Sequence, residues 1–256
     1  MPGAEAQQRI GFGIDIGGSG IKGAPVDLET GELTAERLRI PTPSPSKPKA
    51  VASTVSELVA AFDLDPAVPV GLTFPAPIKH GVVPFIANLH KSWKGVDVPA
   101  LMSEAIGQPV IAVNDADAAG VAEAVYGAAR GVPGVVLVTT LGTGIGSALV
   151  VDGTLVPNTE LGHLEIDGAD AEDRAASSAR ENENLSWEEW AERLQRFYST
   201  VEMLFSPDLI VVGGGVSKKH EKFLPLLRTT APMVPAALRN TAGIVGAAYL
   251  AAHGYR

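Results

Sequence analysis

The chain has 256 residues, of which 46% are hydrophobic and 19% charged, and its formal net charge is −9. This composition is that of a globular protein long enough to bury a core. The acidic balance argues against a general nucleic-acid-binding protein, because such binding depends on many Lys and Arg contacts with phosphate. The chain has no cysteine, which excludes disulfides, cysteine-ligated zinc and a thiol nucleophile and is compatible with a cytoplasmic location.

The chain begins with MPGAEAQQRI, which lacks the basic-then-apolar order of a signal peptide. Apolar runs at residues 10–16 and 21–28 predict two strands joined by the turn Gly17-Gly-Ser-Gly20, and residues 33–40 predict a third strand of an antiparallel meander. Residues 41–48, PTPSPSKP, can form neither a ladder nor a helix and are therefore a connector.

The next part of the chain predicts one helix, two buried strands and an alanine-rich helix. Apolar residues at helical spacing place the first helix at residues 50–62. The runs VPVGLTF at 68–74 and VIAV at 110–113 predict the strands, and the alanine-rich helix follows Asn114.

Residues 134–151 are uncharged, but their Thr/Gly-rich centre lies between β-branched runs, which favours two strands and a turn over a membrane-spanning helix. We therefore expect no contact with a membrane. Further on, we expect a long amphipathic helix at 185–205, a strand from 209 running into a helix after Gly215, and a closing helix that ends at Gly254.

A meander with a glycine turn, followed by helices and strands, thus occurs twice in the sequence. This duplication predicts two related α/β lobes with a cleft between them, which is a common place for a ligand. We expect an N-terminal lobe at residues 1–114 and a C-terminal lobe at 115–239, and we expect the closing helix at 240–256 to pack back on the first lobe.

The first glycine turn is a candidate site for an anion. Gly17, Gly18 and Gly20 allow positive φ and remove side chains, so consecutive backbone N–H groups can face a phosphate. Ser19 adds a hydroxyl donor and Lys22 a positive charge. The alternative interpretation is an ordinary tight hairpin, because glycine motifs alone are weak signals.

The second glycine turn repeats this arrangement, with Gly142, Thr143 and Gly144 after Thr140. Two such turns in two lobes predict a clamp on phosphate. A third glycine run, 213–215, lies between a strand and the helix expected after it, where a phosphate can lie close to the backbone. The cations that follow are either a track for a phosphate chain or an ordinary solvated helix face: Lys218, Lys219, Lys222 and Arg228.

Two further groups of polar residues are candidates for chemistry. Asn114 and Asp115 follow a buried strand, where they either cap the next helix or form a catalytic pair at the carboxyl end of the strand. Glu160 and His163 flank a glycine and make a compact donor–acceptor set suited to sugar hydroxyls. As a zinc site this set is poor.

These motifs, in this order, resemble the sugar kinases of the ROK family, whose fold is α/β and actin/hexokinase-like (ribonuclease H-like). DIGGSGIKG and LGTGIG resemble the family's two phosphate loops, ND its catalytic segment, ELGH its sugar-binding motif, and GGG its nucleotide-proximal glycines. The family's cysteine-rich zinc loop is replaced here by a stretch without cysteine, so we expect no structural zinc. In that respect the chain resembles the compact polyphosphate glucokinases of actinobacteria, as it does in IANLHKSWKG and LSWEEWAERL.

The resemblance implies that inorganic polyphosphate, with or without ATP as an alternative donor, phosphorylates the 6-hydroxyl of glucose. Asp115 is then the catalytic base, and the sugar is held by Asn114, Asp115, Glu160, His163 and a further glutamate after the loop, for which we take Glu172 from its place before RAAS. Mg²⁺ is expected near Asp15, directly or through water. A strictly ATP-dependent hexose or amino-sugar kinase is the alternative. A sugar-sensing repressor is disfavoured, because only about ten residues precede the first strand. The family also suggests a homodimer.

Overall fold

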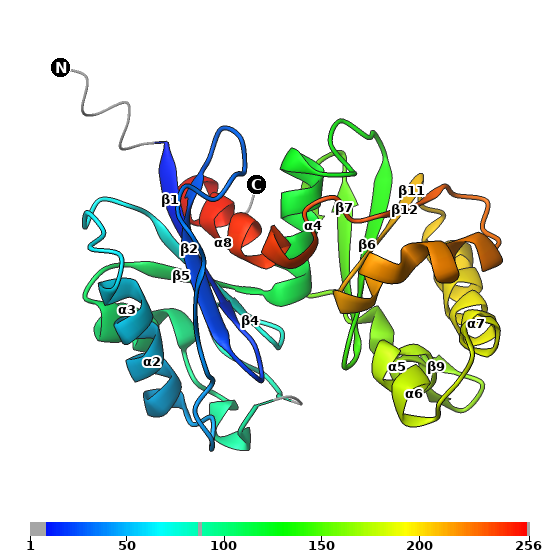
Figure 1. Cartoon of the computed structure of the whole chain (residues 1–256), viewed down its shortest axis with the longest axis horizontal. Helices are drawn as coiled ribbons and strands as arrows, with labels where there is room; N and C mark the ends of the chain where they lie inside the picture. Colours follow the sequence, from blue (N-terminus) through cyan, green and yellow to red (C-terminus); the bar gives the residue numbers. More distant parts are fainter. Residues whose placement is uncertain (1–8, 87–88, 255–256) are drawn as a thin grey trace. The chain divides into compact units, whose positions relative to one another are not determined.

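The computed structural model describes residues 9–86 and 89–254 (Figure 1). Residues 1–8 of the segment MPGAEAQQRI and two positions of IANLHKSWKG, Ala87 and Asn88, lie outside the described residues. Within the described part of the chain, no helix has the length and apolar character needed to cross a bilayer. The chain divides into two units: the first extends to Ala118 and resumes at Thr241, and the second lies between them.

The first unit is built on a five-stranded sheet of order β3-β2-β1-β4-β5. Its strands are β1 (Ile10–Ile16), β2 (Ile21–Asp27), β3 (Leu38–Ile40), β4 (Val70–Phe74) and β5 (Val110–Asn114). Its helices are α2 (Pro48–Ala60), α3 (Val98–Ile106), α8 (Ala242–His253) and the 3₁₀ turns η1 (Lys91–Trp93) and η5 (Arg239–Thr241), the last beginning in the second unit. Strands β1, β4 and β5 are parallel, whereas β1, β2 and β3 form the antiparallel meander.

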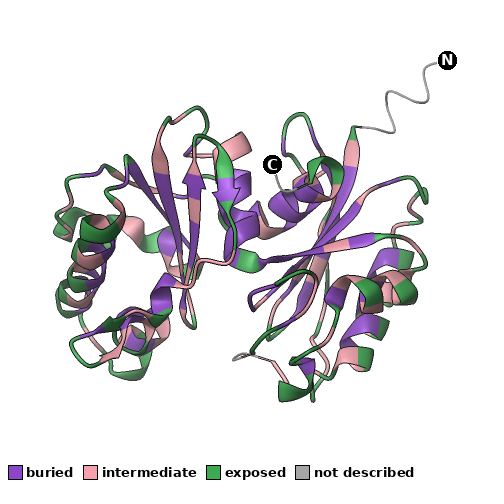
Figure 2. Cartoon of the chain, turned by 180° about the vertical axis from the view of Figure 1, so that it is seen from behind, coloured by how far each residue is buried: buried purple, intermediate pink, exposed green. Residues whose placement is uncertain are grey.

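Successive residues of β1 face opposite sides of this sheet, and each side is covered by a helix. Gly13 faces α8, and a Cβ there would lie 1.9 Å from the carbonyl oxygen of Ile244. Gly71 on β4 gives the same helix room, since its Cβ would lie 2.0 Å from the carbonyl oxygen of Ala247. On the other face, Phe12 packs edge-on against Phe62 beyond α2. The strands are consequently buried along most of their length (Figure 2).

The second unit is built on a five-stranded sheet of order β12-β11-β6-β7-β8. Its strands are β6 (Val135–Leu141), β7 (Ile145–Val151), β8 (Thr154–Val156), β11 (Leu209–Gly213) and β12 (Met233–Pro235). A separate hairpin pairs β9 (Glu165–Ile166) with β10 (Ala169–Asp170). The α-helices are α4 (Asp115–Tyr126), which begins in the first unit, α5 (Ala171–Ala175), α6 (Ser177–Asn182) and α7 (Trp187–Phe205). The 3₁₀ segments are η2 (Leu161–His163), η3 (Gly215–Lys222) and η4 (Leu224–Leu226).

Helices α4 and α7 cover this sheet. Gly120 brings α4 close to β7, because a Cβ there would lie 2.5 Å from the Cβ of Ala148. Helix α7 buries Phe197 and Tyr198, and the Tyr198 hydroxyl lies 2.8 Å from Oγ1 of Thr139 on β6. Burial of the phenol raises its pKa well above the usual range. The capping box of Ser186 and Glu189 fixes the start of the helix.

The strands predicted at 10–16, 21–28, 68–74 and 110–113 and the helices at 50–62, 185–205 and 242–254 are present to within a few residues. The third meander strand is shorter than expected, covering only Leu38–Ile40. Pro25 of β2 explains this: its carbonyl accepts the N–H of Thr34, but it has no N–H of its own to donate toward the third strand.

A helix follows Gly215 as expected, but it is not an α-helix. The segment is 3₁₀, and its backbone leaves the helical region at Lys219 (φ −111°, ψ 23°). The chain turns there toward Phe223, which is fully buried and packs edge-on against Trp190. The lysines of this segment therefore do not form one face of an α-helix.

The division between the units falls inside α4, whereas the sequence suggested a boundary at the end of β5. The first turn of α4 packs within the first unit, because Gly246 of α8 meets the backbone of Ala118 and a Cβ there would lie 1.8 Å from its carbonyl oxygen. Helix α8 itself contacts β1 and β4.

Candidate active site

In the first unit, the carboxyl ends of three parallel strands are level with one another. Asp15 of β1 is in register with Thr73 of β4, and Phe74 of β4 is in register with Asn114 of β5. In open α/β sheets this edge is where ligands bind. The two candidate sites found in the sequence of this unit, the first glycine turn and the Asn114–Asp115 pair, therefore lie at one edge of the sheet.

The carboxylate of Asp15 is held on both oxygens. Oδ2 lies 2.9 Å from Nζ of Lys22, and Oδ1 accepts a hydrogen bond of 3.0 Å from Oγ1 of Thr73. Gly243 in the first turn of α8 also lies nearby, and a Cβ there would be 3.8 Å from Oδ1. Lys22 thus neutralises Asp15, a role that the sequence did not suggest. Thr73 was not recognised as part of this group, although a polar residue inside the buried run VGLTF was a signal for it.

The first glycine loop, Gly17–Gly20, is held by hydrogen bonds that its carbonyl groups accept from side chains. Thr42 donates to the carbonyl of Gly17 at 2.5 Å, and Arg39 donates to that of Ser19 at 2.8 Å. Among the described residues with positive φ, none belongs to this loop or to the second one, so positive φ is not the reason for glycine here. At Gly20 the reason is space, because a Cβ there would lie 2.6 Å from the guanidinium of Arg39.

Asn114 acts as the cap of α4. Its Oδ1 accepts the N–H groups of Ala116 at 2.8 Å and of Asp117 at 3.1 Å, which leaves its amide NH₂ available for a ligand. Asp115 is exposed, and its Oδ1 accepts the N–H of Ala116 at 2.9 Å. The cap interpretation is therefore confirmed for Asn114, and the catalytic role of the neighbouring Asp115 stays a prediction.

In the second unit, the glycine loop Gly142–Gly144 is held by the helices that follow the sugar motif. Ser178 of α6 donates its N–H to the carbonyl of Gly142 at 3.0 Å and its hydroxyl to that of Thr143 at 2.6 Å. Glu172 of α5 accepts the N–H of Ile145 at 3.0 Å through Oε2. A Cβ at Gly144 would lie 2.3 Å from that oxygen, so glycine is needed there to admit the carboxylate.

Glu172 also lies at the sugar motif. Its Oε1 is 3.9 Å from Nδ1 of His163, and a Cβ at Gly162 would lie 3.2 Å from its Oε2. A Cβ at Gly162 would also lie 2.3 Å from the carbonyl oxygen of Ile145, which explains the glycine between Glu160 and His163. One carboxylate therefore contacts both the second glycine loop and the sugar motif.

The acidic and basic groups of the motif shift one another's pKa. Burial raises the pKa of Glu160, an effect that His163 opposes and Glu172 reinforces. Partial burial disfavours protonation of His163, but a hydrogen bond to Asp170 and the charges of Glu172, Asp170 and Glu160 outweigh it and raise the pKa of the ring. The Nδ1 of His163 lies 3.2 Å from Oδ2 of Asp170, which fixes the orientation of the ring. The sequence did not suggest Asp170.

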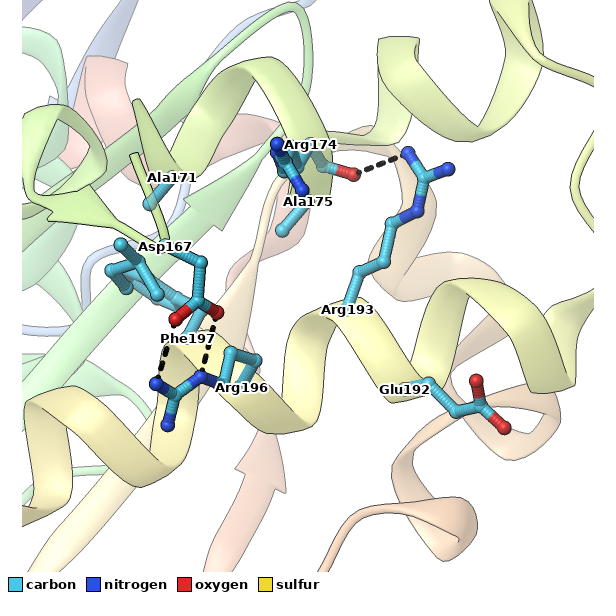
Figure 3. Close-up of a pocket in the computed structure, with 9 residues that line it drawn as sticks. Asp167, Ala171, Arg174, Ala175, Glu192, Arg193, Arg196 and Phe197 are labelled. Atoms are coloured by element: carbon cyan, nitrogen blue, oxygen red, sulfur yellow. Dashed lines mark hydrogen bonds and ion pairs between the residues drawn. The ribbon is translucent and has the colours of Figure 1, made fainter. Parts of the chain in front are cut away.

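Asp170 is carried by the β9–β10 hairpin, whose turn is anchored to α7. Asp167 in the turn accepts two hydrogen bonds from Arg196, at 2.8 and 2.9 Å (Figure 3). Between the hairpin, α5 and α7 lies a pocket of about 220 Å³ whose wall includes Arg174, Arg193 and Phe197. None of the residues lining it was predicted as a site residue, and Arg193 and Arg196 are already paired with carboxylates.

The third glycine run, 213–215, begins at the end of β11, at the same edge of the second sheet as the second glycine loop. Gly213 is in register with Thr140 of β6. Gly214 has φ +82°, and a Cβ there would lie 2.2 Å from the carbonyl oxygen of Leu141, so this position requires glycine on both counts. Lys218, Lys219 and Lys222 follow and are exposed.

Comparison with known proteins agrees with these motifs. Residues 11–177 match the model of the ROK family. The polyphosphate glucokinase of Mycobacterium tuberculosis is 51% identical over 248 residues, covering 96% of this chain and 92% of the relative. The chain belongs to the ROK family.

Two solved structures extend this comparison. An inorganic polyphosphate/ATP-glucomannokinase from Arthrobacter sp. strain KM superposes with a TM-score of 0.91 at 57% identity, over 95% of this chain and 98% of that one. A ROK family glucokinase from Streptomyces griseus, in complex with glucose and AMPPNP, gives a TM-score of 0.80 at 25% identity, over 96% and 100%. The expected actin/hexokinase-like α/β fold is therefore confirmed.

Proposed function

We propose that this ROK-family chain is a kinase that transfers a phosphoryl group from inorganic polyphosphate, and also from ATP, to the 6-hydroxyl of glucose. The observation that supports this most is the 51% identity to a polyphosphate glucokinase over 96% of the chain. The two glycine loops and the exposed Asp115 are the groups that such a reaction needs, since phosphoryl transfer depends on positioning and electrostatics.

On the sugar side, we assign hydroxyl recognition to Asn114, Glu160, His163 and Glu172. Asn114 offers its amide NH₂, because its oxygen is used in the cap. His163 is held in orientation by the contact of its Nδ1 with Asp170. That bond supplies the orientation of the ring that a metal would otherwise give, and we expect no zinc in this loop.

In the chemical step, we assign the base to Asp115. A carboxylate within reach of the 6-hydroxyl can take its proton as the new bond forms. As the hydroxyl oxygen bonds to the terminal phosphorus, the phosphoanhydride bond to the next phosphate breaks, and the shortened chain or ADP leaves with the electron pair.

On the donor side, backbone N–H groups of the loops at 17–20 and 142–144 bind the phosphates, with Thr140 and the 213–215 run beside the second loop. Mg²⁺, when bound, offsets the negative charge of the donor. Within the described residues no three potential ligands are grouped, and Lys22 and Thr73 occupy the oxygens of Asp15. This fits an ion held chiefly by the donor and water, with Asp15 reached through water.

The first test is substitution of the proposed base. Asp115→Asn keeps an oxygen for the N–H of Ala116 but cannot take a proton, so turnover should fall about 10³-fold. Glucose affinity, measured by calorimetry without donor, should change little. Turnover within a few-fold of the wild type would overturn the assignment.

A strictly ATP-dependent glucokinase is the second candidate, because the Streptomyces griseus relative was solved with AMPPNP. A coupled glucose-6-phosphate assay with polyphosphate, ATP and GTP separates the two candidates. Activity with ATP but none with polyphosphate would favour the second. We also propose a homodimer in the cytoplasm, which sedimentation velocity and cell fractionation would test.

A further inference from the structure

Two cations in the second unit gather around one indole ring. The guanidinium carbon of Arg180 lies 3.7 Å from the ring centroid of Trp187, and Nζ of Lys222 lies 5.6 Å from it. Phe223 stacks on the same ring, with centroids 6.1 Å apart and planes 13° apart. Trp187, with these partners, holds the cations in place and is not a free platform for a nucleobase.

Neither cation is neutralised by a carboxylate. Across residues 9–86 and 89–254, no ion pair joins Arg180 or Lys222 to an acidic side chain. The Nε of Arg180 is buried and has no hydrogen-bond acceptor. Arg193, by contrast, is paired with Glu183 at 2.6 Å. A cation–π contact does not remove positive charge, so both groups keep the charge that attracts an anion.

Both cations lie on elements whose first residues are close in space to the second glycine loop. Arg180 lies on α6, two residues beyond Ser178, which bonds to the carbonyls of Gly142 and Thr143. Lys222 ends η3, which follows the close contact of Gly214 with Leu141. The loop and the cation pair are thus joined by short, ordered segments within one unit.

We propose that Arg180 and Lys222, held by Trp187, bind phosphates of the donor chain beyond those at the second glycine loop. The subsite takes a linear polyanion, inorganic polyphosphate, and ATP does not need it because its chain stops at three phosphates. This inference rests on the proposed function. The sequence suggested that Lys218, Lys219 and Lys222 form a track for the phosphate chain. The subsite proposed here uses only Lys222 of these three, together with Arg180 of α6.

The test compares Arg180→Gln, Lys222→Gln and the double variant with the wild type. Arg130→Gln is the matched control, since Arg130 is an exposed arginine in the turn before β6, at the opposite end of that strand from the loop. Measurements are KM for long-chain polyphosphate, tripolyphosphate, ATP and glucose at several salt concentrations, with circular dichroism to verify folding.

We expect the KM for long-chain polyphosphate to rise severalfold in each single variant and more than about tenfold in the double variant, the size of a lost charge-assisted contact. Its dependence on salt should become shallower, while KM for tripolyphosphate, ATP and glucose stays within about twofold of the wild type.

An unchanged KM for long-chain polyphosphate in the double variant would overturn the subsite, as would an equal rise for ATP. A wild type that does not use polyphosphate at all would overturn the proposed function itself. The two failures are therefore distinguishable.

Discussion

At the scale of single residues, the bond between Asp170 and His163 affects the pH at which this proposed sugar ligand is charged. The raised pKa of His163 depends on that bond and on the charges of Glu172, Asp170 and Glu160. The protonated ring therefore stabilises the fold below its unfolded pKa of about 6.5, and this contribution is lost as pH rises through the higher folded pKa.

Asp170→Asn should lower the pKa of His163 and raise KM for glucose severalfold, because the ring loses a charged acceptor and its fixed orientation. An NMR titration of the imidazole C–H signals measures the first effect. Asp173→Asn, at an exposed position of α5, is the control and should change neither. An unchanged His163 titration in Asp170→Asn would show that this bond does not set the pKa.

The raised pKa of Glu160 gives a second pH effect. Because burial disfavours its charge and Glu172 adds repulsion, Glu160 takes up a proton at a higher pH than an ordinary glutamate. Affinity for glucose should therefore fall on the acid side, and Glu172→Gln should move that fall to lower pH. Calorimetric titrations of glucose between pH 4 and 7 in both proteins would show it. A fall at the same pH in both would contradict the coupling.

At the scale of elements, the second glycine loop and α5 are joined through Glu172. Gly144→Ala places a Cβ where the carboxylate lies and should displace it from the N–H of Ile145. Gly142→Ala is the matched control, since a Cβ there meets no atom within 4 Å. We expect glucose affinity without donor to fall about tenfold in the first variant only. Equal glucose affinities in the two variants would show that Glu172 does not contribute to glucose binding.

The long elements could be predicted from the sequence because their apolar patterns are strong, as in β1, β2 and α7. The short elements around the sugar motif, β9, β10, α5 and α6, were missed, since a few residues carry no periodicity. Helix α3 was also missed, although Asp97 at its start and Gly107 at its end are ordinary capping signals. The site motifs could be located in the sequence. Thr73 and Asp170, which contact Asp15 and His163, could be identified only from the structure.

At the scale of the whole molecule, a buried carboxylate joins the two segments that connect the units. Glu123 on α4 is fully buried and accepts the N–H groups of Ala128 at 2.7 Å, Ala237 at 3.1 Å and Leu238 at 2.8 Å. Helix α4 is one connection, and residues 237–238 lie just before the other.

Glu123→Ala should lower the free energy of unfolding by about 4 kcal/mol, because three partly buried N–H groups lose a charged acceptor. Glu123→Gln should cost less, since one oxygen remains to accept. Urea denaturation measures both, and Glu104→Ala, an exposed position of α3, should stay within about 0.5 kcal/mol of the wild type. A loss in Glu123→Ala no larger than in this control would show that water satisfies these groups.

The source of the His163 orientation has a consequence for how the protein matures. Asp170 belongs to the same hairpin that Asp167 and Arg196 fasten to α7, so the imidazole is aligned as soon as this part of the chain folds. The orientation of the ring is therefore set by the folding of one continuous stretch of chain, from the sugar motif to α7.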